Sequence, residues 1–99
     1  MSEKLTVQDA IGHPDFIPTF RGELKRLYTE KSRIEDTGLK LKRTPFDRLT
    51  SRGVFVYDDK LVEHVRAVME QRSKLPSGER QTLLHLTYMT IARMHEKMK

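Results

Sequence analysis

The chain has 99 residues, of which 36% are hydrophobic and 33% charged, with a formal net charge of +5 and no cysteine. This length suits a single domain, residues 1–99, with one modest core, and the lack of cysteine excludes disulfides, thiolate metal sites and a cysteine nucleophile. No stretch reaches the ~18 apolar residues of a membrane span and the first residues lack an apolar signal segment. We therefore expect a cytoplasmic protein that does not enter a membrane.

Two helices are predicted in the first third of the chain. Thr6 followed by Asp9 has the spacing of a capping pair and predicts a short helix near 7–11. Asp15 is a suitable N-cap for a longer helix near 16–36, because apolar residues then recur at helical spacing along one stripe. The residues of that stripe are Phe16, Phe20, Leu24, Leu27, Tyr28 and Ile34.

The middle of the chain combines strand-like and helix-like patterns. Residues 39–42 alternate apolar and charged side chains, which favours a very short strand. Thr44 before Pro45 predicts a short helix near 45–51, since proline is preferred at the first helical position. The β-branched and aromatic residues 54–57 favour a second very short strand. Two such strands are marginal unless a helix covers one face.

The last third of the chain predicts two amphipathic helices, near 59–74 and 78–98, separated by a short proline-containing turn. A short connection between amphipathic helices implies an antiparallel αα-hairpin. We expect Val65 and Ile91, which lie in the middle of the two apolar stripes, to be buried. The chain as a whole is expected to be a compact, mainly α domain.

Positive charge is greatest in the middle of the chain. The net charge is −1 for residues 1–30, +4 for residues 31–57 and +2 for residues 58–99. Cations that share a face can bind a polyanion, because each one near a phosphate releases a condensed counterion. The competing interpretation is a solvated surface whose cations pair with local carboxylates. The predicted nucleic-acid-binding residues are Lys40, Lys42, Arg43, Arg48 and Arg52.

The last predicted helix is apolar on two faces. Leu86 and Met89 lie away from its main stripe, and Arg93 follows one turn later. A helix of this kind is either central in a bundle or contacts a second chain. The first alternative has Val7 and Ile11 of the short N-terminal helix cover this face. The second predicts a protein interface of Leu86, Met89 and Arg93, in a homodimer or with a protein partner.

The sequence contains no pattern typical of an enzyme. The four histidines lack zinc-ligand spacing, and two adjacent carboxylate pairs lie where helix ends are predicted. Phosphate-binding loops, dinucleotide glycine patterns and nucleophile elbows are missing. We therefore expect no catalysis, no metal and no cofactor.

Two functions remain open at the level of sequence. The first is a small, non-enzymatic regulatory or nucleic-acid-associated protein that binds DNA or RNA through its central basic surface. The alternative is a protein–protein adaptor or inhibitor that acts through the C-terminal helix.

Overall fold

The computed structural model describes residues 6–40, 42 and 44–97, and these residues form helices, turns and loops without a strand. The expectation of a compact, mainly α protein is confirmed. Leu41 of the first predicted strand and Arg43 of the predicted basic surface lie outside the described residues. The helices, in chain order, are α1 (Val7–Ile11), α2 (Phe16–Glu35), α3 (Pro45–Ser51), α4 (Asp58–Met69) and α5 (Ser77–Lys97).

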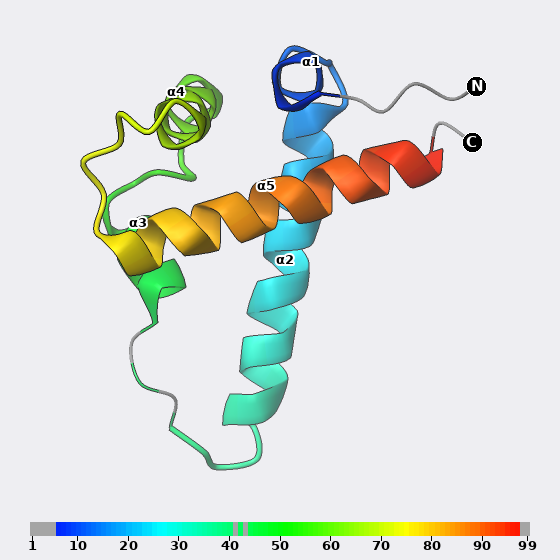
Figure 1. Cartoon of the computed structure of the whole chain (residues 1–99). Coiled ribbons are helices and arrows are strands. Elements are labelled where there is room, and N and C mark those ends of the chain that lie inside the picture. The colour runs from blue at the N-terminus through cyan, green and yellow to red at the C-terminus, as the bar shows by residue number, and fades with distance from the viewer. Residues whose placement is uncertain (1–5, 41, 43, 98–99) are drawn as a thin grey trace.

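Helix α5 is the central element of the fold. It crosses α2 and also packs against α1, α3 and α4 (Figure 1). In the view where α5 lies across the picture α4 is seen end-on, so these two helices cross steeply (Figure 1). Both helices of the expected αα-hairpin are therefore formed, but they cross steeply and are not antiparallel. The physical reason is that α5 must cover α2 and α3 as well as α4.

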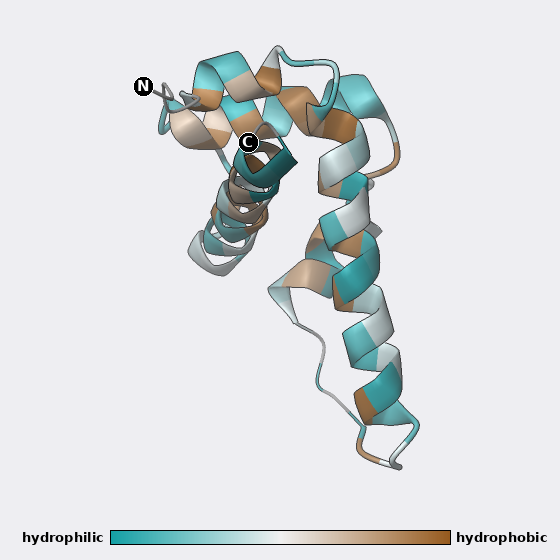
Figure 2. Cartoon of the chain, turned by 90° about the vertical axis from the view of Figure 1, so that its right-hand side faces the viewer, coloured by the Kyte–Doolittle hydropathy of each residue, from teal (hydrophilic) through white to brown (hydrophobic). Residues whose placement is uncertain are grey.

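The core joins all five helices in one cluster of buried side chains. Val65 and Ile91 belong to it, as expected, and Leu86 is 0% exposed. Hydrophobic segments gather where the helices meet, whereas the lower part of α2 is mainly hydrophilic (Figure 2). Every buried residue of α2 lies at or before Leu24. The second half of this helix therefore extends away from the core.

The predicted strand at 54–57 is wrong, because these residues form turns. Gly53 has a φ of 76° and ends α3 in a Schellman motif, in which the Val54 N–H donates to the Leu49 carbonyl at 3.2 Å. Val54 and Phe55 are both buried. Their side chains enter the core directly from a turn, so they need no partner strand.

The other predicted strand, 39–42, is also not formed in its described residues. Leu39, Lys40 and Lys42 lie in a loop without regular structure, and all three are exposed. An alternating pattern favours a strand only when a neighbouring strand or helix buries its apolar face. Leu39 is exposed to solvent, so burial of its side chain does not stabilise a strand here.

Helix α4 ends at Met69, earlier than the expected residue 74. The Gln71 N–H donates to the Val68 carbonyl at 3.2 Å and the Arg72 N–H donates to the Ala67 carbonyl at 2.8 Å, which is again a Schellman motif. Gln71 occupies the left-handed position with a φ of 59°. That conformation is strained for a residue with a Cβ.

Replacing Gln71 with glycine should therefore stabilise the protein. Relief of the left-handed strain exceeds the extra chain entropy of glycine, so we expect a gain of about 0.5–1 kcal/mol in the free energy of unfolding by urea. Glu70→Gly is the matched control, since Glu70 has a φ of −86° and gains nothing from glycine. A Gln71→Gly protein no more stable than the wild type would contradict the strained turn.

Candidate nucleic-acid interface

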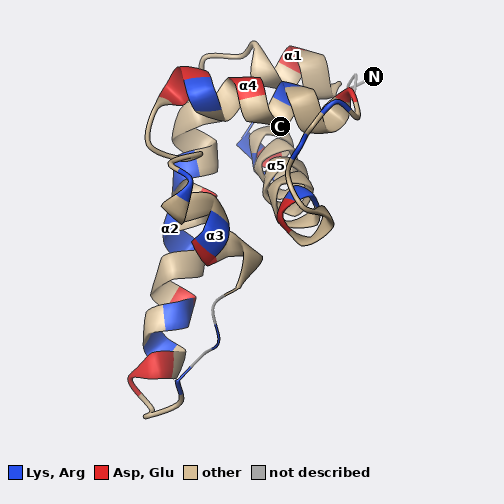
Figure 3. Ribbon diagram, turned by 90° about the vertical axis from the view of Figure 1, so that its left-hand side faces the viewer, with Lys and Arg blue, Asp and Glu red and all other residues tan. Residues whose placement is uncertain are grey.

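The positive charge of the chain is gathered in one projecting part. We call residues 25–52 the basic arm; it consists of the second half of α2, the loop that follows and α3. The arm contains nine lysines and arginines against four carboxylates, which equals the whole net charge of +5. Cations are seen on the lower half of α2, on the loop and on α3 (Figure 3). The rest of the chain is electrically balanced.

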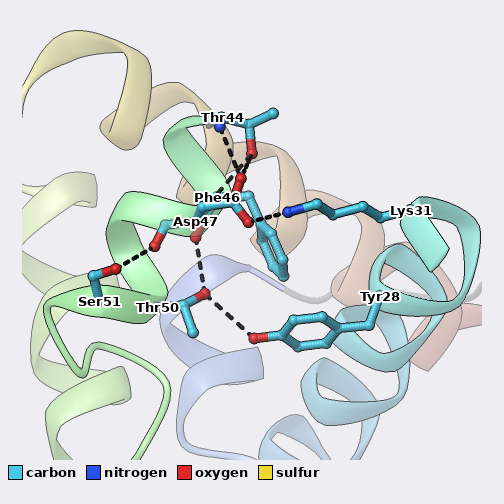
Figure 4. A network of polar contacts seen from close by, with 7 residues as sticks. All are labelled: Tyr28, Lys31, Thr44, Phe46, Asp47, Thr50 and Ser51. Carbon is cyan, nitrogen blue, oxygen red and sulfur yellow. Dashed lines mark hydrogen bonds and ion pairs between the residues drawn. The ribbon is translucent and has the colours of Figure 1, made fainter. Parts of the chain in front are cut away.

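An ion pair fastens α3 to α2 within the arm. The Lys31 ammonium donates to the Asp47 carboxylate at 2.6 Å (Figure 4). The same carboxylate accepts from the backbone N–H and the hydroxyl of Thr44 at 2.8 and 2.9 Å, which completes the capping box of α3. Asp47 therefore caps one helix and binds the other.

Aromatic packing provides the second connection between α2 and α3. The Tyr28 ring lies edge-on to the Phe46 ring with centroids 4.8 Å apart. The Tyr28 and Thr50 hydroxyls lie 3.3 Å apart, and the Thr50 hydroxyl also donates to the Phe46 carbonyl at 2.9 Å (Figure 4). These contacts fix the orientation of α3, on which Arg48 is exposed.

The Lys31–Asp47 pair shifts the pKa of both groups. The hydrogen bond to Asp47 raises the pKa of Lys31 above its ordinary value, against a smaller opposing effect of burial. Burial alone raises the pKa of Asp47, but the hydrogen bonds from Lys31 and Thr44 together outweigh it and hold that pKa below its ordinary value. Both shifts favour the charged forms, so Asp47 has its charge compensated by Lys31.

Three of the predicted phosphate-binding residues are available to a ligand. Lys40, Lys42 and Arg48 are exposed, and none of them forms an ion pair within the described part of the chain. Arg43, the fourth, lies outside the described residues. The fifth residue, Arg52, is differently placed.

Arg52 compensates a buried carboxylate. Its Nε lies 3.0 Å from Oε2 of Glu79, which is 1% exposed at the start of α5. Neither carboxylate oxygen of Glu79 accepts an aligned hydrogen bond from the described residues, so this ion pair is what balances the buried charge. We therefore assign Arg52 a structural role and remove it from the proposed phosphate contacts.

The main apolar residue of the predicted protein interface on α5, Leu86, is not on the surface. Leu86 is 0% exposed and belongs to the same core cluster as Ile11 of α1, so it is not available to a partner. Met89 is half-buried, and Arg93 donates through Nε to the buried Glu23 carboxylate at 2.9 Å. The alternative in which the N-terminal helix helps to cover α5 agrees with these positions.

Sequence reasoning missed three cations of the arm. Lys25, Arg26 and Arg33 are exposed on the outward side of α2. Lys25 and Arg26 precede the basic segment 31–57, whereas Arg33 lies within that segment but is not among its predicted phosphate-binding residues. Their recurrence at helical spacing, opposite the apolar stripe, is a signal that could have found them.

Other kinds of site find no support in the described residues. No three histidine or acidic side chains among them are grouped closely enough to hold a metal ion. Within those same ranges, none of the helices combines the length and hydropathy needed to cross a membrane. Comparison of the chain with protein-family models, curated proteins and solved structures finds no match.

Neutralising Asp47 should change how stability depends on pH. Folding lowers the pKa of the Asp47 carboxyl below its ordinary value of 3.8. The ionised carboxylate therefore stabilises the folded protein at a pH above 3.8, and this stabilisation is lost as the pH falls through the pKa of the folded state. Asp47→Asn should therefore lower the melting temperature at pH 6, and the difference from the wild type should narrow below pH ~4. Lys31→Met should show the same narrowing. A difference that stays constant down to pH ~2.5 would contradict the pairing.

Removing the Arg52 side chain should destabilise the fold. Arg52→Ala leaves the Glu79 carboxylate buried and uncompensated, so we expect a loss of about 1–3 kcal/mol in urea unfolding. Arg48→Ala, an exposed arginine on the same short helix, should change stability by less than about 0.5 kcal/mol. Adding Glu79→Gln to Arg52→Ala should restore part of the loss. Equal effects of the two arginine substitutions would disprove the structural role.

Proposed function

We propose that the protein is a small, non-enzymatic nucleic-acid-binding protein that contacts the sugar-phosphate backbone through the basic arm. The contact residues are Lys40, Lys42 and Arg48, together with Arg43 from the sequence pattern. The observation that carries the proposal is the location of the entire net charge of +5 in residues 25–52. The remainder of the chain contributes no net attraction to a polyanion.

The arrangement of ion pairs supports this proposal. Asp47 is the single carboxylate between residues 40 and 52, and it is already bound by Lys31 and Thr44. Arg48 therefore has no local carboxylate to hold it. Unpaired, exposed cations bind phosphate at low cost, because they give up only water and release counterions from the nucleic acid.

The magnitude of the salt dependence follows from the number of contacts. Four phosphate contacts on duplex DNA give a log–log slope of affinity against salt of about −3.6. Raising the salt from ~50 to ~200 mM should then weaken binding on the order of 100-fold. The affinity that these backbone contacts contribute is largely independent of sequence.

Fluorescence anisotropy with a 20-base-pair DNA duplex and an RNA of equal length tests the proposal. We expect Lys40→Ala and Lys42→Ala each to reduce the magnitude of the slope by about 0.7–0.9. Lys97→Ala is the matched control, because this lysine lies at the far end of α5 from the arm (Figure 1). No binding at ~50 mM salt, or an equal loss from Lys97→Ala, would refute the proposal.

A pull-down of the tagged protein separates this function from that of an adaptor. We expect the co-purifying material to be lost when the lysate is treated with nuclease. Protein partners that remain bound after nuclease treatment and at high salt would instead favour the adaptor or inhibitor function.

A further inference from the structure

We infer that the ligand of the arm is double-stranded DNA and that the outward face of α2 enters its major groove, with Arg26, Thr29 and Arg33 directed at base edges. This inference rests on the proposed function and specifies it. The loop and α3 then position the protein on the backbone, while α2 supplies contacts that depend on sequence.

The outward face of α2 is a continuous polar stripe. A shallow hollow runs along it and is lined by Gly22, Lys25, Arg26, Thr29, Glu30 and Arg33. Side chains three, four and seven positions apart lie on the same side of a helix, so these residues form one surface. Three of them are cations and one is a carboxylate, which makes the stripe complementary to a negatively charged groove.

Gly22 is an independent sign that another molecule approaches this stripe. It lies exposed inside α2, where glycine disfavours a helix relative to alanine. A Cβ at this position would meet nothing within 4 Å, so packing within the chain does not require glycine. Close approach of a phosphate backbone to the helix would explain why a side chain is missing there.

The dimensions of the arm favour a DNA duplex. Residues 25–35 extend for about 16 Å beyond the buried half of α2, and a helix with its side chains is about 10–12 Å across. The major groove of B-form DNA is about 12 Å wide and admits such a helix. The deep, narrow major groove of an RNA duplex does not.

The aromatic residues of the arm argue against a single strand. Proteins that bind single strands stack the bases on exposed aromatic rings. Phe46 is buried, and Tyr28, although 41% exposed, lies edge-on to Phe46 with its hydroxyl beside that of Thr50. The described part of the arm therefore exposes one partly covered aromatic ring, not the series of rings on which a single strand stacks its bases.

The two arginines of the stripe are held only weakly within the chain. Arg26 lies 3.8 Å from Glu23 and Arg33 lies 3.7 Å from Glu30, and the arginine side chains are 61% and 77% exposed. The Arg33–Glu30 pair is exposed on both sides, and an exposed pair at this distance contributes little. Arg93 Nε also lies 2.9 Å from the buried Glu23 carboxylate. Glu23 therefore keeps an ion-pair partner when Arg26 turns away to contact a base. Arginine can then bind guanine through two hydrogen bonds.

Selection of preferred sites from a pool of random 20-base-pair duplexes tests the inference. We expect the wild type to bind a selected duplex at least ~10-fold more tightly than an unselected one. Arg26→Ala and Arg33→Ala should each reduce that preference by about 5–100-fold or to unity. Arg33→Lys should keep the salt slope but not the preference, and Gly22→Leu should weaken binding to all duplexes. Arg66→Ala on α4 is the control and should change neither quantity.

The outcomes separate the two proposals. A preference unchanged by both alanine substitutions, or tighter binding to single-stranded DNA or to duplex RNA, would overturn the major-groove placement while leaving the basic arm as the binding surface. Failure of the wild type to bind any nucleic acid would overturn the proposed function together with this inference. Loss of preference with the salt slope retained by Arg33→Lys would establish that the arginine reads bases through its planar guanidinium.

Discussion

A continuous row of aromatic rings holds the structure together. Phe16 contacts Phe20, Phe20 contacts Phe55, Phe55 contacts Phe46 and Phe46 contacts Tyr28, with centroid separations of 5.7, 5.9, 5.9 and 4.8 Å. Each contact of this kind adds about 0.5–1.5 kcal/mol beyond the burial of its area. The row begins where α2 enters the core, passes through the turn after α3 and returns to the exposed half of α2. The arm is thereby attached to the core at two places.

This attachment determines where the charges lie. Because Phe46 and Asp47 face α2, the remaining polar side of α3 and the loop before it face solvent, and Lys40, Lys42 and Arg48 lie there. Outside the arm, Arg93 balances the buried Glu23 carboxylate. The fold thus separates a neutral body from a cationic arm, and this separation would orient the protein as it approaches a polyanion.

The sequence predicted the helices because their signals are local. The capping pair that begins at Thr44 and the apolar stripes need only neighbouring residues to be recognised. The prediction of a strand at 54–57 was wrong because β-branched and aromatic residues can also be buried from a turn, as Val54 and Phe55 are. The burial of Leu86 and the pairing of Arg52 with Glu79 depend on how α5 crosses the other helices. No local pattern encodes that crossing, so the site could be predicted only as a basic region.

The distribution of buried residues along α2 has a consequence for motion. Its buried side chains end at Leu24, whereas residues 25–35 are covered on one side only. Backbone amides with few buried neighbours exchange their hydrogens through local openings, which cost much less free energy than global unfolding. The last turns of α2 can therefore fray and reform while the first half of the same helix stays intact. One continuous helix would then serve as a rigid anchor at its start and as an adaptable contact at its end.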